Sequence, residues 1–133
     1  MAKAGKSSKA SRKADFDKTF ATLKALLKRN RTHTRVDVDR PGYYSVFVKS
    51  ALCKGRPLWF AGVRKGKSYV SYHLLPLYVC PELARDVPPG LKKRQQGKAC
   101  FNFTAVEPAH LRELGALTKK GLAIFREKFA APE

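Results

Sequence analysis

A cysteine and a histidine in the second half of the chain are the two side chains that together could supply a nucleophile and a base. Such catalysis needs a thiol within hydrogen-bond reach of an imidazole, and a third group that orients the imidazole. Cys100 and His73 lie outside any recognised catalytic signature, and no orienting acid is identifiable for them. A cysteine in a short strand is usually a small buried apolar residue. We therefore expect no catalytic residues, no cofactor and no enzymatic activity.

The segment GVRKGKS, residues 62–68, resembles a phosphate-binding loop. That motif needs four residues between its two glycines and leads into a helix, so that backbone N–H groups surround the phosphates. Here three residues separate Gly62 from Gly66, and a strand is expected to follow. A hairpin turn at Lys65-Gly66 explains the second glycine without a ligand. We expect no nucleoside triphosphate site in this segment.

Two aspartates, Asp37 and Asp39, alternate with valines and could place two metal ligands on one face of a strand. Hard cations prefer oxygen ligands, and an iron site of the carboxylate type needs many of them on one surface. The chain has only 10 acidic residues, and they are spread along the whole sequence. We expect both aspartates to lie on the solvent face of an edge strand, and we expect no metal site.

A histidine near the middle of the chain alternates with Ser71 and Tyr69 along one face of an expected strand. It could line a small-ligand pocket with an aromatic and a basic side chain from other segments. The residues of this possible pocket are Trp59, Tyr69, His73 and Lys98. The alternative is an ordinary, partly buried histidine that is satisfied within the fold. The sequence identifies no ligand for either case.

Positive charge is the strongest compositional signal. The 28 Lys and Arg residues, against 10 Asp and Glu residues, give a formal net charge of +18. Such a field attracts nucleic acid, an anionic membrane surface or an acidic partner, or it only maintains solubility. The bases of a possible polyanion patch are Arg64, Lys65, Lys67, Lys92, Lys93 and Arg94. No recognised DNA or RNA motif accompanies them, so any nucleic-acid binding is expected to be weak and independent of sequence.

The three cysteines, Cys53, Cys80 and Cys100, form no CxxC pair and have no histidine at metal-ligand spacing. An odd, scattered set is typical of reduced thiols in a cytosol. No apolar stretch approaches the roughly 18 residues that span a bilayer, and the first residues lack the apolar segment of a secretory signal. We expect a cytoplasmic protein, with a mitochondrial transit peptide in the basic, acid-poor leader as the minor alternative. The sequence leaves the oligomeric state and the partner open.

The first 14 residues contain five bases, no acid and mostly small side chains. We expect residues 1–14 to form a disordered basic arm, and residues 15–133 to form a single domain. The first helix of this domain is expected to begin at Asp15. The apolar residues that recur there at helical spacing are Phe16, Phe20, Leu23 and Leu27.

Alternation with a period of two predicts the strands that follow. One hairpin is expected over residues 36–48, with Pro41-Gly42 in a type II turn, and a second over residues 58–75. A short last strand is expected over residues 100–103. We expect an antiparallel sheet from this order of strands.

Prolines predict the helices after the second hairpin. Short helices are expected over residues 81–85 and 91–96, and Pro108 opens a helix that continues to about residue 129. The whole order predicts an α+β fold, in which an antiparallel sheet of about five strands is covered by the N- and C-terminal helices.

Two blocks of the sequence resemble the YdhG-like domain of unknown function, a family of uncharacterised bacterial proteins. They are PLWFAGVRKGKSYVSYHLLPLYVCPEL, residues 57–83, and LKKRQQGKACFNF, residues 91–103, within a resemblance that covers roughly residues 43–129. The resemblance implies an α+β fold related in outline to frataxin, and some relatives carry the label of intracellular iron chaperone. We expect a non-enzymatic cytosolic binding module of this type with an unknown ligand. The alternatives are a frataxin-like iron chaperone and a weak nucleic-acid or polyanion binder.

Overall fold

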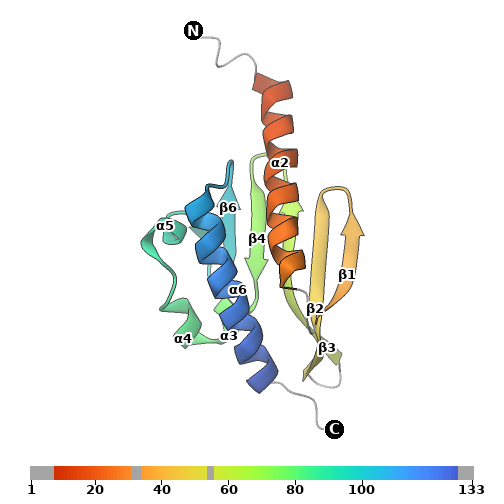
Figure 1. Ribbon diagram of the computed structural model, residues 1–133, viewed down its shortest axis with the longest axis vertical. Helices are drawn as coiled ribbons and strands as arrows, with labels where there is room; N and C mark the ends of the chain where they lie inside the picture. Colours follow the sequence, from red (N-terminus) through yellow and green to blue (C-terminus); the bar gives the residue numbers. More distant parts are fainter. Residues whose placement is uncertain (1–7, 31–33, 54–55, 129–133) are drawn as a thin grey trace.

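The computed structural model describes residues 8–30, 34–53 and 56–128, and these form two layers. One layer is a six-stranded antiparallel sheet with the strand order β1-β2-β3-β4-β6-β5. The other layer contains an N-terminal and a C-terminal helix, which lie on the same face of the sheet (Figure 1). The expected fold class is confirmed, and the sheet has one strand more than expected.

The first helix, α2, spans Ser8–Arg29 and begins earlier than the sequence analysis places it. Residues 8–14 of the expected arm are helical, and residues 1–7 lie outside the described part of the chain. No glycine or proline lies between Ser8 and Asp15, and alanine, lysine and arginine favour helix. The first turns of α2 extend past the end of the sheet, whereas the rest of the helix covers it (Figure 1). The side chains buried there are Phe16, Leu23, Leu26 and Leu27.

The first hairpin joins β1 (Thr34–Arg40) to β2 (Tyr43–Cys53) through the expected two-residue turn. Gly42 in this turn has a φ of 81°, the left-handed conformation that a type II turn requires at its second central residue. β2 pairs in turn with β3 (Arg56–Lys65), and β3 pairs with β4 (Val70–Leu74) as the second predicted hairpin.

Three short helices connect β4 to the edge of the sheet, and each begins at a proline. They are α3 (Pro76–Val79), α4 (Pro81–Ala84) and α5 (Pro89–Lys92). A proline fits the first helical position because its missing N–H would have no partner there. The prediction of a helix over residues 91–96 is wrong. α5 ends at Lys92, and Gln95–Gln96 forms the two-residue strand β5.

β5 pairs with β6 (Cys100–Phe103), which has the predicted bounds. The chain then enters α6 (Pro108–Lys128), also close to prediction. α6 packs tightly on α3, because a Cβ at Gly121 would lie 3.0 Å from Cγ of Pro76. Only glycine allows this approach without a shift of one of the helices.

The hydrophobic core lies between the sheet and the two long helices. Aromatic residues from neighbouring strands provide much of it, and the ring of Phe60 meets that of Phe125 at 5.8 Å between centroids. The Tyr72 hydroxyl, also buried, makes a 2.7 Å hydrogen bond with the Thr118 hydroxyl of α6. Within the described residues, no helix is long and apolar enough to span a membrane.

Candidate binding face of the sheet

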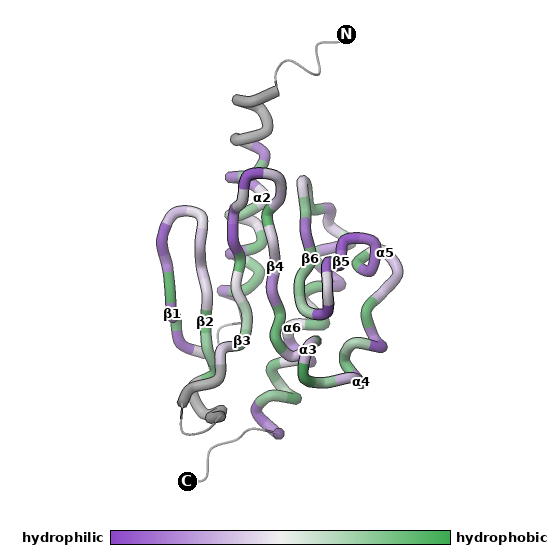
Figure 2. The backbone as a smooth tube through the Cα atoms, turned by 180° about the vertical axis from the view of Figure 1, so that it is seen from behind, coloured by the Kyte–Doolittle hydropathy of each residue, from purple (hydrophilic) through white to green (hydrophobic). Residues whose placement is uncertain are grey.

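The second face of the sheet carries no helix in the described part of the chain. Seen from behind, the strands lie in front of both long helices (Figure 2). We call this surface the open face. Its side chains alternate with those of the core along each strand, and the registers place them in rows that cross the strands.

One row of the open face is basic and polar. Arg40 pairs with Tyr43, Tyr43 with Arg64, Arg64 with Ser71, and Ser71 with Asn102. The backbone continues this row towards β5, because the N–H of Asn102 donates to the carbonyl of Arg94 at 2.8 Å. The row therefore has a residue on each of β1, β2, β3, β4 and β6 and crosses the sheet, whose neighbouring strands are about 4.8 Å apart.

Two arginines of this row lie over one aromatic ring. The guanidinium carbons of Arg64 and Arg40 are 5.6 and 5.7 Å from the Tyr43 ring centroid. A second pair, Arg35 and Phe47, lies on the same face with a separation of 6.0 Å. These separations lie within the range of cation–π attraction. The arginine heads are therefore held beside ring faces.

A β-bulge in β3 directs the only tryptophan of the chain to the open face. Val46 pairs with Ala61, yet the next residue Phe47 pairs with Trp59, so Phe60 is the extra residue. Phe60 is fully buried against α6, and Trp59 lies on the same face as Phe47. Regular alternation would have reversed the directions of these two aromatic side chains.

The indole of Trp59 lies close to Gly62. A Cβ at this glycine would be 3.0 Å from Cζ2 of Trp59 and 3.1 Å from Cβ of Ser45. The indole also meets His73 edge to face, with 6.5 Å between ring centroids. Because its neighbours hold it on two sides, the indole is an ordered and partly exposed aromatic surface.

Polar side chains of β4 and β6 share the open face with this indole. Ser71 donates a 2.8 Å hydrogen bond to Oδ1 of Asn102, and the Cys100 thiol donates to the same oxygen at 3.4 Å. Sγ of Cys100 is 4.0 Å from Nε2 of His73. The fold therefore does bring together the cysteine and the histidine that the sequence analysis considered as a nucleophile and its base.

The electrostatics of this pair favour the uncharged form of both groups. Burial lowers the pKa of His73 from its ordinary value, and the positive charge of Arg64 lowers it further. Burial raises the pKa of the Cys100 thiol, and the Ser71 hydroxyl opposes this by a smaller amount. A nucleophilic cysteine needs the opposite shift, towards the thiolate. Asn102 also contacts the thiol and not the imidazole, so it does not orient His73 as a base.

The four residues of the possible pocket are only partly brought together. Trp59 and His73 are in contact, as described above. Tyr69 lies just before β4 and is 49% exposed, and Lys98 places its ammonium 5.5 Å from the Tyr78 ring centroid, beside α3. The structure therefore presents an open surface around Trp59 and His73, to which Tyr69 and Lys98 are peripheral.

The six bases of the possible polyanion patch do not lie together on one surface. Arg64 lies in the basic row of the open face, and the backbone of Arg94 extends that row. Lys65 instead pairs with Asp17 of α2, on the helical side. Lys67 lies exposed between β3 and β4, and Lys92 and Lys93 lie exposed at the end of α5.

The two aspartates of β1 do not share a strand face, so that expectation is wrong. A bulge between Val36 and Val38 makes Asp37 the extra residue, and it accepts a 3.3 Å hydrogen bond from Ser45. Asp39 pairs with Lys24 of α2 at 2.8 Å, on the helical side. Among the described residues, no group of three or more His, Cys, Asp or Glu side chains is placed to hold a metal ion.

Several open-face residues were missed at the sequence level. They are Arg40, Tyr43, Ser45, Phe47 and Asn102. The alternation of Tyr43, Ser45 and Phe47 in β2 is visible in the sequence and could have indicated a shared face. The neighbours of these residues on β1 and β3 are set by the strand register and its bulges, and alternation alone does not predict that register.

Comparisons with known proteins found no matching family model, no matching curated protein and no matching solved structure. The resemblance to the YdhG-like domain therefore stays a prediction.

Proposed function

We propose that this chain is a non-enzymatic binding module whose open face binds single-stranded nucleic acid. The observation that carries the proposal is the row in which Arg40 and Arg64 lie over the Tyr43 ring, beside the ordered indole of Trp59. Proteins that bind single strands combine aromatic rings, on which bases stack, with cations that contact the phosphates. Both groups are present here on one uncovered surface.

The charge on the open face supports an anionic ligand. The described strands contain two acidic residues, and only one of them, Asp37, contacts an open-face side chain. The same face carries three arginines, Arg35, Arg40 and Arg64. The formal net charge of +18 adds a long-range attraction for polyanions.

A single strand fits this face better than a duplex does. A duplex stacks its bases inside and presents them only at their edges, so stacking on Tyr43, Phe47 or Trp59 would need the bases to be released. The hydroxyl of Ser71 and the amide of Asn102 can hydrogen-bond to base edges. Burial lowers the pKa of His73 and raises that of the Cys100 thiol, and these directions support the non-enzymatic part of the proposal.

Titration of the protein with a labelled oligothymidylate tests the proposal. The expected result is saturable binding that quenches the emission of Trp59, the single tryptophan, because a base stacks on the indole. The affinity should fall with salt, with a log–log slope of about −0.7 for each phosphate contacted. A duplex of equal length should bind more weakly.

Two variants of equal charge separate a specific face from attraction by net charge. Arg64→Gln removes a cation from the open face, and Arg126→Gln removes one exposed cation from α6. The first should weaken oligonucleotide binding at least fivefold, and the second by less than twofold. Equal losses in both variants, or an unchanged tryptophan emission at saturation, would contradict binding at the open face.

A further inference from the structure

A groove lies between the two long helices, on the side of the molecule opposite the open face. It has a volume of about 550 Å³ and is lined by the end of α2 and the first half of α6. Leu26, Leu111 and Ala116 contribute apolar surface to it. Gly115 adds no side chain, and a Cβ placed there would only touch Cδ1 of Leu26 at 3.8 Å. The groove is therefore open above its apolar lining.

Three cations and no carboxylate line this groove. They are Arg29 from α2, and Arg112 and Lys119 from α6. Arg112 and Lys119 are two turns apart, or about 10 Å along the helix axis. Within the described chain none of the three has an acidic side chain within ion-pair distance. Their positive charge exceeds the partial negative charge at the C-terminus of α2.

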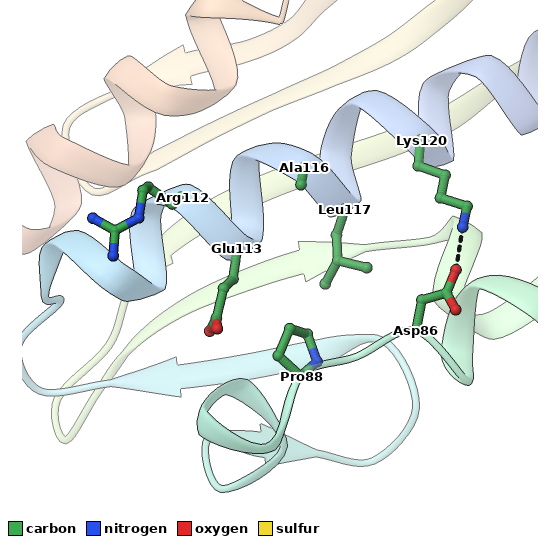
Figure 3. A pocket seen from close by; sticks show the side chains of 7 residues that line it. All are labelled: Asp86, Pro88, Arg112, Glu113, Ala116, Leu117 and Lys120. Carbon is green, nitrogen blue, oxygen red and sulfur yellow. Dashed lines mark hydrogen bonds and ion pairs between the residues drawn. The ribbon is translucent and has the colours of Figure 1, made fainter.

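A neighbouring pocket of about 510 Å³ shows a different charge pattern. Lys120 there is neutralised by Asp86, and the Glu113 carboxylate extends towards Pro88 (Figure 3). Arg112 also lines this pocket and points away from Glu113 (Figure 3), so two carboxylates there balance two cations. An anion is therefore disfavoured in the neighbouring pocket and favoured in the groove between the helices.

We propose that the groove between α2 and α6 binds an organic phosphate of about nucleotide size. The three cations would contact the phosphate, and the apolar lining would cover a flat ring. Asn30, which is 8% exposed, lines the groove and uses its amide nitrogen to donate to the Leu26 carbonyl at 2.9 Å. Its side-chain carbonyl can therefore accept a hydrogen bond from a ligand hydroxyl or amine.

This proposal is independent of nucleic-acid binding at the open face, because the two surfaces share no residue. Calorimetry with adenosine monophosphate as the probe tests it. The probe should bind more tightly than adenosine or inorganic phosphate alone, because each of these engages only half of the groove. No binding of the probe at millimolar concentration would overturn the proposal.

Three variants locate the binding. Arg112→Ser with Lys119→Ser should weaken binding of the probe at least tenfold. Gly115→Leu should weaken it as much without changing the charge, because the new side chain fills the groove. The matched control, Lys92→Ser with Lys93→Ser, removes the same charge elsewhere and should change the affinity less than twofold. An unchanged affinity in Gly115→Leu, or an equal loss in the control, would overturn the proposal.

If Gly115→Leu does not fold, the site can be located in the unmodified protein from the changes in backbone amide NMR chemical shifts on addition of the probe. The probe should shift residues 26–30 and 111–119 and leave the emission of Trp59 unchanged. Shifts confined to β3, β4 and β6 would place the probe on the open face and would overturn the groove site. Oligonucleotide binding should persist in the double variant of Arg112 and Lys119, so failure of one proposal is distinguishable from failure of the other.

Discussion

The indole of Trp59 lies so close to Gly62 that a single methyl group at residue 62 would reach within 3.0 Å of it. The same methyl group would lie 3.3 Å from the backbone carbonyl of Tyr44, which has little freedom to move. The position of the indole on the open face thus depends on the absence of a side chain at Gly62, three residues further along β3.

Gly62→Ala should displace the indole and destabilise the protein. Forcing a methyl group into a packed site costs about 1–3 kcal/mol, so the midpoint of chemical unfolding should fall. The emission of Trp59 should shift to the red, since the ring is lifted into water. Unfolding curves and emission spectra measure both effects. Unchanged emission with wild-type stability would show that the indole does not rest on residue 62.

Two glycines of α6 should respond to alanine in opposite directions. Alanine favours helix over glycine by about 1 kcal/mol, and Gly115 has room for the methyl group. Gly115→Ala should therefore stabilise the fold by up to about 1 kcal/mol. Gly121→Ala should destabilise it, because the methyl group would lie 3.0 Å from Pro76. Thermal unfolding of the two variants gives the sign of each effect, and equal signs would contradict the close packing of α6 on α3.

Arg64→Gln should raise the pKa of His73. Burial is the larger cause of the lowered pKa and remains in the variant, so the pKa should rise only in part. In the unmodified protein the imidazole should titrate below about 6.5. The unfolded chain then binds the proton first, so this group stabilises the fold above pH 6.5 and loses that contribution as the pH falls. NMR titration of the ring protons checks the direction, and an unshifted midpoint in the variant would contradict the proximity of Arg64.

Tyr72 should make the fold sensitive to alkaline pH. Burial raises the pKa of its phenol, and the hydrogen bond with Thr118 offsets only part of this. Above about pH 10 the unfolded chain releases this proton while the folded chain keeps it, so stability should fall with rising pH. Tyr72→Phe should lose this part of the pH dependence, and should cost about 1–2 kcal/mol at neutral pH because Thr118 loses its partner. Chemical unfolding at pH 7 and pH 10.5 compares the two proteins.

Local patterns in the sequence were sufficient for most of the fold. The alternation around Tyr44 and Val46, and the prolines at residues 81 and 108, predicted elements that the structure contains. Gln95 was predicted to be helical but lies in a strand. This strand forms only by pairing with β6, which follows it in the chain. A pairing of this kind has no local signal.

The residues of the candidate site were harder to predict from the sequence, because β-bulges decide which side chains share a face of the sheet. Trp59 and His73 were proposed to lie together and their rings are in contact, yet regular alternation along β3 would have turned Trp59 towards the core. The extra residue in β3, Phe60, is apolar like its neighbours, so the hydrophobic pattern does not mark it as a bulge. The separation of Asp37 from Asp39 depends in the same way on a bulge that the alternating sequence VDVD conceals.

The bulge at Phe60 determines how β3 would respond to a change in its length. Deletion of this one residue would remove the bulge and restore simple alternation, with Ala61 still opposite Val46 and Trp59 still opposite Phe47. The indole would keep its outward direction, and the core would lose the phenyl ring that now packs on Phe125 of α6. A related chain with a one-residue gap at this position would therefore keep the aromatic platform and would need another side chain to fill the core beneath α6.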